Sequence, residues 1–296
     1  MLLLVMAAWG SPARSQSLEP RSYSNAPVGL NFLIGAYGYS SGNVDFDPAV
    51  PLTDAHLTTN SGVVAFGRSY GAFGRSGKFD VIAPVVSLAG DALSNGQRVT
   101  RDIAGLADTQ FRISYNFIGA PAMDLAQFAH YRQDLIVGAS LAITVPWGQY
   151  DDTRLVNIGT NRWSFKPELG MSKAVGPWIF DVYAAVTYYT TNDDFLNGGY
   201  LRLDPMYSTQ AHVIRSLPRG AWVAANANYY WGARATVNGR STDSLQASSR
   251  FGMTLALPVN KRNSIKLLAA RCVWTRTHSN FTNFGLAWQY RWGAGL

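Results

Sequence analysis

The chain of 296 residues is poor in charge: Asp, Glu, Lys and Arg make up 15% of it, against roughly 25% in ordinary soluble domains. Mean hydropathy is −0.03, and no apolar run approaches the ~18 residues that a membrane-spanning helix needs. The formal charge of +7 comes from Lys and Arg residues scattered singly along the chain, which argues against nucleic acid as a partner.

The first residues predict a secretory signal peptide over residues 1–15. Residues 2–9 are apolar, and Ala13 and Ser15 supply the small side chains that precede a cleavage site before Gln16. Residues 16–296 then form one predicted domain. This domain opens with a turn-rich stretch, residues 18–31, that we expect to lead into the first strand. The stretch is too short for an N-terminal plug domain, which argues against an energy-coupled receptor.

Alternation of apolar and polar residues recurs along the whole domain. In residues 110–117, every second residue is aromatic or aliphatic and the residues between are polar. This is the periodicity of a strand with two unlike faces. Segments of this kind lie at 31–39, 61–73, 79–87, 110–117, 134–146, 165–172, 178–189, 207–217, 221–233, 248–257, 264–274 and 283–292. They amount to about twelve strands, an even number, as bacterial outer-membrane barrels have.

The connections between these segments alternate in length. Short turns are expected at 74–78, 175–177, 218–220 and 258–263, and longer polar loops at 40–60, 88–103, 147–163, 190–205 and 235–245. Short periplasmic turns and long outer loops are typical of outer-membrane barrels. Residues 119–133 are the exception, because a long connection stands where a short one is expected. We predict a helical turn there, on the periplasmic side.

The last strand ends in three aromatic residues on one face, Trp288, Tyr290 and Trp292. Aromatic girdles mark the membrane interfaces of such barrels. The sequence therefore predicts an all-β fold: a transmembrane, antiparallel, up-and-down β-barrel of the bacterial outer membrane, with membrane lipids around it. A soluble β-sandwich is the alternative, since sandwich strands also alternate.

Several runs of residues resemble one family. They are L-E-P-R-S-Y-S-N-A-P-V-G-L-N at 18–31, G-L-A-D at 105–108, N-I-G-T-N-R-W at 157–163 and W-Q-Y-R-W at 288–292. The sequence is similar in these runs to the outer-membrane proteins grouped as the "putative MetA-pathway of phenol degradation". The resemblance implies a barrel fold and transport of small molecules, with aromatic compounds favoured by the family's link to phenol catabolism. We also expect the C-terminal strand to engage the barrel-assembly machinery.

Polar residues on the lumen side of the predicted strands are the candidates for a solute path. They are Arg112, Asn116, Lys166, Glu168, Asp181, Tyr183, Gln210, His212, Asn226, Asn228, Arg250, Gln289 and Arg291. If their charges pair across the lumen, the interior is a plug of salt bridges; if the charges segregate, it is a selective pore. The alternative role for each residue is simply to stabilise the barrel interior.

Signals for catalysis or cofactors are weak. The four histidines are far apart and lack metal-site spacing, and Cys272 is the single cysteine. No metal, cofactor or enzymatic activity is therefore expected. His212 could serve as the base of an outer-membrane lipid hydrolase, but a hydrogen-bonded lumen residue is the simpler interpretation.

The function predicted from the sequence is passive uptake of small molecules across the outer membrane. A non-conducting structural barrel and a lipid hydrolase are the alternatives. A lateral exit for apolar solutes would require a kinked or unpaired strand, and Pro84 and Pro167, which lack an N–H group, are the places to look for one.

Overall fold

The computed structural model describes residues 18–44, 52–277 and 279–296. The predicted signal peptide lies outside these residues. None of the described helices is both long and apolar enough to span a membrane.

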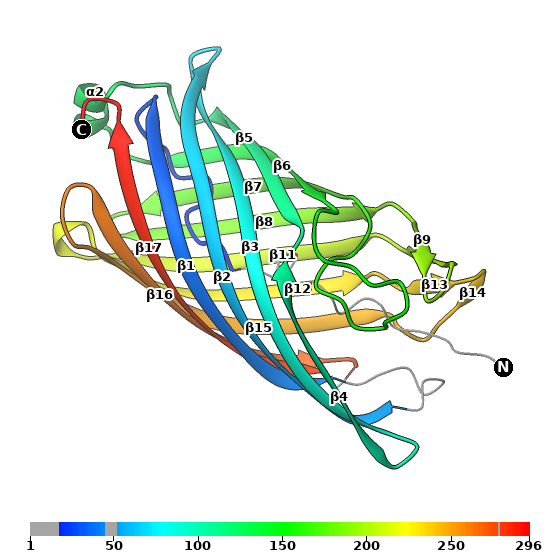
Figure 1. Ribbon diagram of the computed structural model, residues 1–296. Coiled ribbons are helices and arrows are strands. Elements are labelled where there is room, and N and C mark those ends of the chain that lie inside the picture. The colour runs from blue at the N-terminus through cyan, green and yellow to red at the C-terminus, as the bar shows by residue number, and fades with distance from the viewer. Residues whose placement is uncertain (1–17, 45–51, 278) are drawn as a thin grey trace.

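A closed antiparallel barrel of twelve strands dominates the structure (Figure 1), as the sequence predicts. Its strands are β1 (Leu30–Val44), β2 (Leu52–Ala72), β3 (Arg75–Ser94), β5 (Thr109–Ile118), β6 (Leu135–Val145), β7 (Ser164–Val175), β8 (Trp178–Tyr189), β11 (Met206–Ser216), β12 (Trp222–Gly232), β15 (Gln246–Pro258), β16 (Asn263–Thr275) and β17 (Asn280–Gly293). The first and last strands close the barrel, in a ladder that runs from Leu30 opposite Gly293 to Asn43 opposite Asn280.

The outer connections differ from the expectation of plain loops. β2 and β3 are 21 and 20 residues long, so strand covers much of the predicted loops at 40–60 and 88–103. A further strand, β4 (Gln97–Leu106), pairs with the outer part of β3. The alternation used for prediction fades here because these ends project beyond the lipid, where both faces of a hairpin can be polar.

A small second sheet stands at the outer end of the barrel. It consists of β9 (Asn192–Phe195), β10 (Gly199–Leu203), β13 (Ala235–Val237) and β14 (Arg240–Ser241). Phe195, Leu201 and Val237 form a buried apolar cluster beneath it. The predicted loops at 190–205 and 235–245 therefore fold onto each other rather than standing apart in water.

The opposite, periplasmic end carries the short turns and two short helices, α2 (Leu125–His130) and η1 (Pro218–Gly220). Helix α2 confirms the helical turn predicted within 119–133. The Asp124 side chain caps it by accepting a hydrogen bond from Gln127 N, and the Gln127 side chain accepts one from Asp124 N in return.

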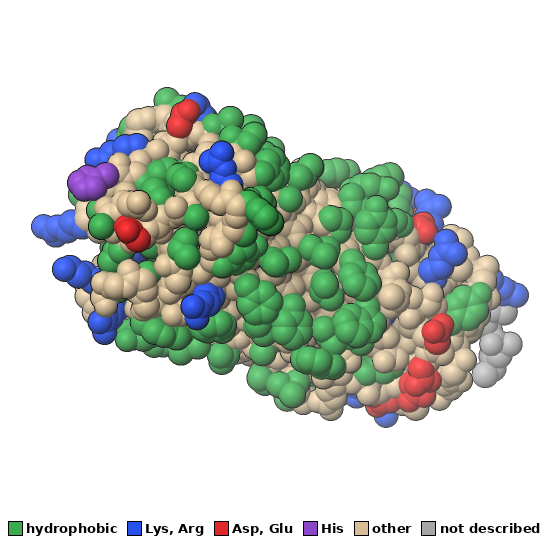
Figure 2. Space-filling view, turned by 90° about the horizontal axis from the view of Figure 1, so that it is seen from above, with side chains coloured by type: hydrophobic (Ala, Val, Ile, Leu, Met, Phe, Trp, Pro, Cys, Tyr) green, Lys and Arg blue, Asp and Glu red, His purple; other side chains and the backbone are tan. Residues whose placement is uncertain are grey.

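The outer surface of the barrel is an apolar belt. Along β8, for example, Trp178, Phe180 and Val182 are exposed while the residues between them are buried. Figure 2 shows the belt between two ends that carry the charged side chains. Each of the twelve barrel strands pairs with a neighbour on both sides, and the belt faces hydrocarbon. This is the architecture of a bacterial outer-membrane protein, with membrane lipids as its surroundings.

The C-terminal aromatic residues form a continuous stack at the periplasmic end of this belt. The ring centroids of Trp288 and Tyr290 lie 6.1 Å apart, and those of Tyr290 and Trp292 lie 5.7 Å apart. The stack lies where β17 approaches the short turns, at the level expected for an interface girdle.

Candidate functional site: a lumen crossed by the N-terminal segment

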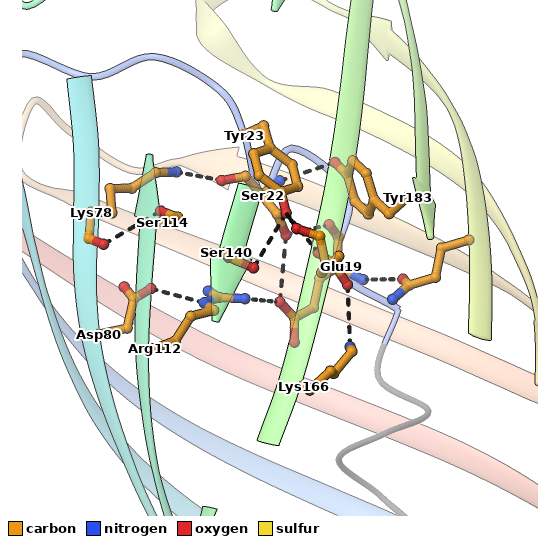
Figure 3. Close-up of polar contacts among 12 residues, drawn as sticks. Glu19, Ser22, Tyr23, Lys78, Asp80, Arg112, Ser114, Ser140, Lys166 and Tyr183 are labelled. Atoms are coloured by element: carbon orange, nitrogen blue, oxygen red, sulfur yellow. Dashed lines mark hydrogen bonds and ion pairs between the residues drawn. The ribbon is translucent and has the colours of Figure 1, made fainter. Parts of the chain in front are cut away.

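The lumen holds residues 18–29, which we call the N-terminal segment. The sequence predicts only a turn-rich approach to β1, but this segment lies inside the barrel and contacts strands from several sides (Figures 1 and 3). Tyr23, at its centre, is 2% exposed. No separate plug domain is needed, because the approach to the first strand itself occupies the lumen.

Charged groups fix one side of the segment. Arg112 on β5 forms ion pairs with Glu19 of the segment and, at 3.0 Å, with Asp80 on β3. Lys78 on β3 donates a 2.7 Å hydrogen bond to the carbonyl of Ser22. Both cations therefore hold the segment against the β3–β5 wall.

A niche in the facing wall receives the ring of Tyr23. Gly138 on β6 and Gly170 on β7 are opposite each other in the ladder. A Cβ atom at Gly170 would lie 2.0 Å from Tyr23 Cε2, and one at Gly138 would lie 2.7 Å from Tyr23 Cδ1. Only glycine at these two positions leaves room for the ring.

Hydrogen bonds anchor the tyrosine hydroxyl beyond this niche. Tyr23 donates to Glu168 Oε1 at 3.1 Å and lies 3.2 Å from Ser140 Oγ. Lys166 Nζ is 3.2 Å from the other oxygen of the Glu168 carboxylate. The carboxylate thus receives a hydrogen bond and an ion pair, which compensates for its burial.

Asp181 and Tyr183 on β8 bind the main chain of the segment. Arg21 N donates to Asp181 Oδ2 at 2.8 Å, and Ser22 N donates to the Tyr183 hydroxyl at 3.2 Å. The Tyr183 hydroxyl donates in turn to Asp181 Oδ2 at 2.6 Å. The main-chain N–H groups of Arg21 and Ser22, which would otherwise be unsatisfied inside the barrel, therefore have acceptors.

Other predicted lumen residues complete this network. Gln210 Oε1 accepts a hydrogen bond from Glu19 N at 3.3 Å, and Asn116 Nδ2 donates to the Tyr23 carbonyl at 3.3 Å. His212 and Asn226 lie behind them and are 1% and 0% exposed. The His212 ring makes a 2.8 Å hydrogen bond to the Asn226 amide oxygen, so its observed partner is an amide rather than a serine.

The remaining four predicted residues are Asn228, Arg250, Gln289 and Arg291. Asn228 and Arg250 are opposite each other on β12 and β15, and both are buried. Arg291 lies at the periplasmic rim, where its Nε donates to the Lys261 carbonyl at 2.7 Å. Gln289 is on the same strand, β17, and the same face as Arg291.

Sequence reasoning missed the residues of the segment itself, Glu19 and Tyr23, and their partners Lys78 and Asp80. The signal that could have found them is the charged and aromatic content of the 18–31 run, which is unusual for a simple lead-in to a strand. The sequence did not decide whether the lumen charges pair or segregate. In this part of the barrel they pair: Arg112 with two carboxylates, and Lys166 with Glu168.

A cavity of about 440 Å³ lies on the outer side of the segment. Leu18 and Glu19 of the segment line it, together with polar side chains such as Gln110, Arg250 and Asn283. Most of its lining is apolar and includes Leu57, Val63, Ile82, Val86, Leu268 and Phe281. The lumen thus combines a polar, occupied periplasmic half with an open, apolar outer half. No group of histidine, cysteine and carboxylate side chains that could hold a metal ion occurs in the described part of the chain.

Comparisons with known proteins agree with this architecture. An outer-membrane channel from Pseudomonas putida F1 superposes with a TM-score of 0.78 at 18% identity, over 93% of this chain and 100% of that one. The transport unit of the autotransporter AIDA-I from Escherichia coli gives 0.55 at 12% identity, over 96% of each chain. The β domain of the Bordetella autotransporter BrkA gives 0.53 at 10% identity, over 88% of this chain and 100% of that one. These likenesses show the barrel fold.

Among curated proteins, none matches the sequence. Residues 40–291 match the model of the family described as "Putative MetA-pathway of phenol degradation". The match covers most of the barrel, and the family is the one indicated by the motifs at 105–108, 157–163 and 288–292. The chain therefore belongs to this family of outer-membrane barrels.

Proposed function

We propose that the protein is a passive outer-membrane channel for small molecules, with phenol-like aromatic compounds as its solutes. One observation carries the proposal: the lumen is narrowed by the N-terminal segment but keeps an apolar cavity of about 440 Å³ on its outer side. This volume is in the range of sites for small ligands, about 300–1,000 Å³, which are also mainly apolar with a few polar groups. The family's description and the P. putida channel of the same fold support the same class of function.

In this proposal the solute diffuses down its gradient and no cofactor takes part. An aromatic ring is desolvated against the apolar walls of the cavity, and it then passes the polar network around the N-terminal segment. The side chains there that meet it first are Glu19 and Gln110. Because Arg112 and Lys166 are neutralised by carboxylates, we expect weak selectivity between small cations and anions.

A second candidate is a non-conducting barrel with a structural role. The observation that favours it is the N-terminal segment itself, which fills the periplasmic half of the lumen with hydrogen bonds to β7, β8 and β11. If the segment stays docked at all times, no continuous aqueous path crosses the barrel.

Single-channel recording separates these candidates. The refolded protein, checked by its heat-dependent migration on a gel, is inserted into a planar bilayer and recorded with and without phenol or benzoate. We expect discrete conductance steps that either solute reduces. A silent bilayer with correctly folded protein would remove the open channel and favour the structural barrel.

A further inference from the structure

A polar patch lies on the outer surface of the barrel where β16, β17, β1 and β2 run side by side (Figure 1). One row of the ladder crosses these strands from Arg271 through Thr282 and Ser41 to Thr58. The next outward-facing pair on β1 and β2 is also polar. We call this set the outer polar patch, and its members are Arg271, Thr282, Ser41, Thr58, Asn43 and His56.

The side chains of the patch face away from the lumen. Their neighbours along the strands, such as Ala270, Ser40 and Leu57, line the inner cavity. Successive side chains of a strand point to opposite faces, and Arg271 and His56 are exposed. The patch therefore belongs to the surface that surrounds the barrel and not to the solute path.

The patch lies at the outer boundary of the membrane. Asn31 of β1 is opposite Trp292 of the periplasmic aromatic stack, and Ser41 lies ten residues further along the same strand. With a rise of ~3.3 Å per residue and a tilt of ~40°, Ser41 stands about 25 Å above Asn31, which is the height of an apolar belt. Tyr39 and Phe284, just below Ser41, are opposite each other and exposed. The patch thus begins where the hydrocarbon ends.

The outer ends of the strands on the opposite wall carry aromatic rings instead. Tyr207 of β11 stacks on Trp231 of β12, with ring centroids 5.4 Å apart. Trp163 stacks on Phe165 of β7, with centroids 6.4 Å apart. Such rings suit the interface of a membrane of any lipid composition. The outer polar patch is therefore a local departure from a general aromatic girdle.

The charge of the patch is positive. Arg271 forms no ion pair among the described residues, and the patch contains no carboxylate. Two carboxylates lie on its β3–β4 side: Asp91, which pairs with Arg98 at 3.1 Å, and Asp102, two strands beyond Thr58. The β16 end of the patch, at Arg271, therefore favours an anion.

Hydroxyl, amide and imidazole groups make up the rest of the patch. Ser41 Oγ lies 2.9 Å from His56 Nε2 and 3.4 Å from Thr58 Oγ1, and His56 Nδ1 lies 3.0 Å from Asn43 Oδ1. These contacts order the side chains across two neighbouring strands. Exposed groups of this kind can also exchange hydrogen bonds with the hydroxyl and amide groups of a sugar.

We propose that the outer polar patch binds the phosphorylated glucosamine headgroup of one lipopolysaccharide molecule of the outer leaflet. A phosphate pairs with Arg271, because a guanidinium forms two parallel hydrogen bonds to phosphate oxygens. Sugar hydroxyl groups meet Ser41 and His56, and the acyl chains run down over the aromatic girdle below. The height of the patch selects this lipid, since the outer leaflet presents phosphorylated glycolipid at that boundary. The bound lipid spans the β1–β17 seam that closes the barrel, and it does so whatever solute the channel carries.

Native mass spectrometry of the refolded protein in detergent micelles tests the site. The protein is titrated with lipid A that carries both phosphates and, separately, with phosphatidylglycerol. Arg271→Gln removes the cation of the patch. Arg215→Gln is the matched control, because Arg215 is also exposed but lies at the periplasmic end, 4.7 Å from the centroid of the Trp178 ring.

We expect one lipid A molecule on the wild-type protein, about tenfold weaker binding in Arg271→Gln, and unchanged binding in Arg215→Gln. Equal affinity of the wild type for lipid A and phosphatidylglycerol would overturn the proposal. An equal loss in Arg215→Gln and Arg271→Gln would also overturn it, because charge attraction without a site would then explain the binding. Binding in Arg271→Gln that matches the wild type, with both proteins folded by heat-dependent gel migration, would do the same.

Thermal unfolding tests the contribution of the other side chains. A ligand that binds only the folded barrel raises its unfolding midpoint, so lipid A should raise the midpoint of the wild type more than phosphatidylglycerol does. Ser41→Ala/His56→Ala leaves Arg271 in place, and we expect about threefold weaker lipid A binding and a smaller rise of the midpoint. A wild-type midpoint that responds equally to both lipids would contradict the site, and an unchanged response in the double variant would remove Ser41 and His56 from it.

Discussion

Gly170→Ala should release the N-terminal segment without changing any residue of the segment. The added methyl group would lie 2.0 Å from Tyr23 Cε2 and 2.3 Å from Tyr23 Cδ2, so the ring must move by about 1.5 Å to reach an ordinary ~3.5 Å contact. Its hydroxyl bonds of 3.1 and 3.2 Å to Glu168 and Ser140 would not survive that movement.

The expected magnitude follows from two effects. Overpacking in a buried niche typically costs about 1–3 kcal/mol, and loss of a hydrogen bond to a charged group costs about 1.5–3 kcal/mol. Together they weaken docking of the segment by roughly 3–5 kcal/mol, which lowers its docked-to-undocked ratio by a factor of about 10² to 5 × 10³. The periplasmic half of the lumen should then open, and single-channel conductance should rise several-fold.

Two assays report the release. One is conductance in a planar bilayer; the other is the rate at which a polar maleimide labels Ala26→Cys in a Cys272→Ala background, which should increase with the conductance. Gly62→Ala is the matched control, because no heavy atom lies within 4 Å of a Cβ built there. In the double variant Tyr23→Ala/Gly170→Ala, the alanine at position 170 should have no further effect. Unchanged conductance and labelling in folded Gly170→Ala protein would refute the role of the niche.

Three further predictions concern the network, the girdle and catalysis. Arg112→Gln removes the cation that links the carboxylates of Glu19 and Asp80, so it should lower the thermal midpoint of the barrel and raise its cation selectivity, measured by gel shift and reversal potential. Arg98→Gln, whose ion pair is exposed, should change neither. Trp292→Ala removes one ring of the interface stack and should lower the free energy of unfolding from lipid vesicles by about 1–2 kcal/mol in a urea titration; an unchanged midpoint would argue against a girdle. Wild-type protein and His212→Ala should both be inactive in ester and phospholipid hydrolysis, since His212 binds an amide; hydrolysis lost only in the variant would reopen the enzyme hypothesis.

Two glycines of the barrel wall show what sequence reasoning could not reach. Gly138 and Gly170 read as ordinary interruptions of an alternating strand, and nothing local says that a tyrosine from residue 23 fills the space above them. Asp108 and Thr160 likewise belong to separate motifs 52 residues apart, and their pairing depends on how the β6–β7 loop folds back on the wall. Such contacts join distant parts of the chain, and a local pattern carries no information about them.

The sequence by itself determined the barrel, its strand number and its orientation, because each of these follows from local rules. Side chains alternate along a strand with period two, lipid selects apolar residues on one face, and the lengths of the turns and loops distinguish the two ends. The alternation also placed residues such as Arg112, Asp181 and Tyr183 on the inner face.

Only the tertiary structure decided how the lumen is filled. The N-terminal segment enters it because its main chain and its charged and aromatic side chains have partners on many different strands, from β3 to β11. Those strands come together only when the barrel closes. The change of partner along β3, from β5 to β4, was equally hidden, because it depends on which strand each half of β3 pairs with. Pro84 illustrates the contribution of each source. The sequence identified it as a point where the strand ladder could be weak, because proline lacks an N–H group. The fold placed it beside an apolar cavity and a loop held by Asp108.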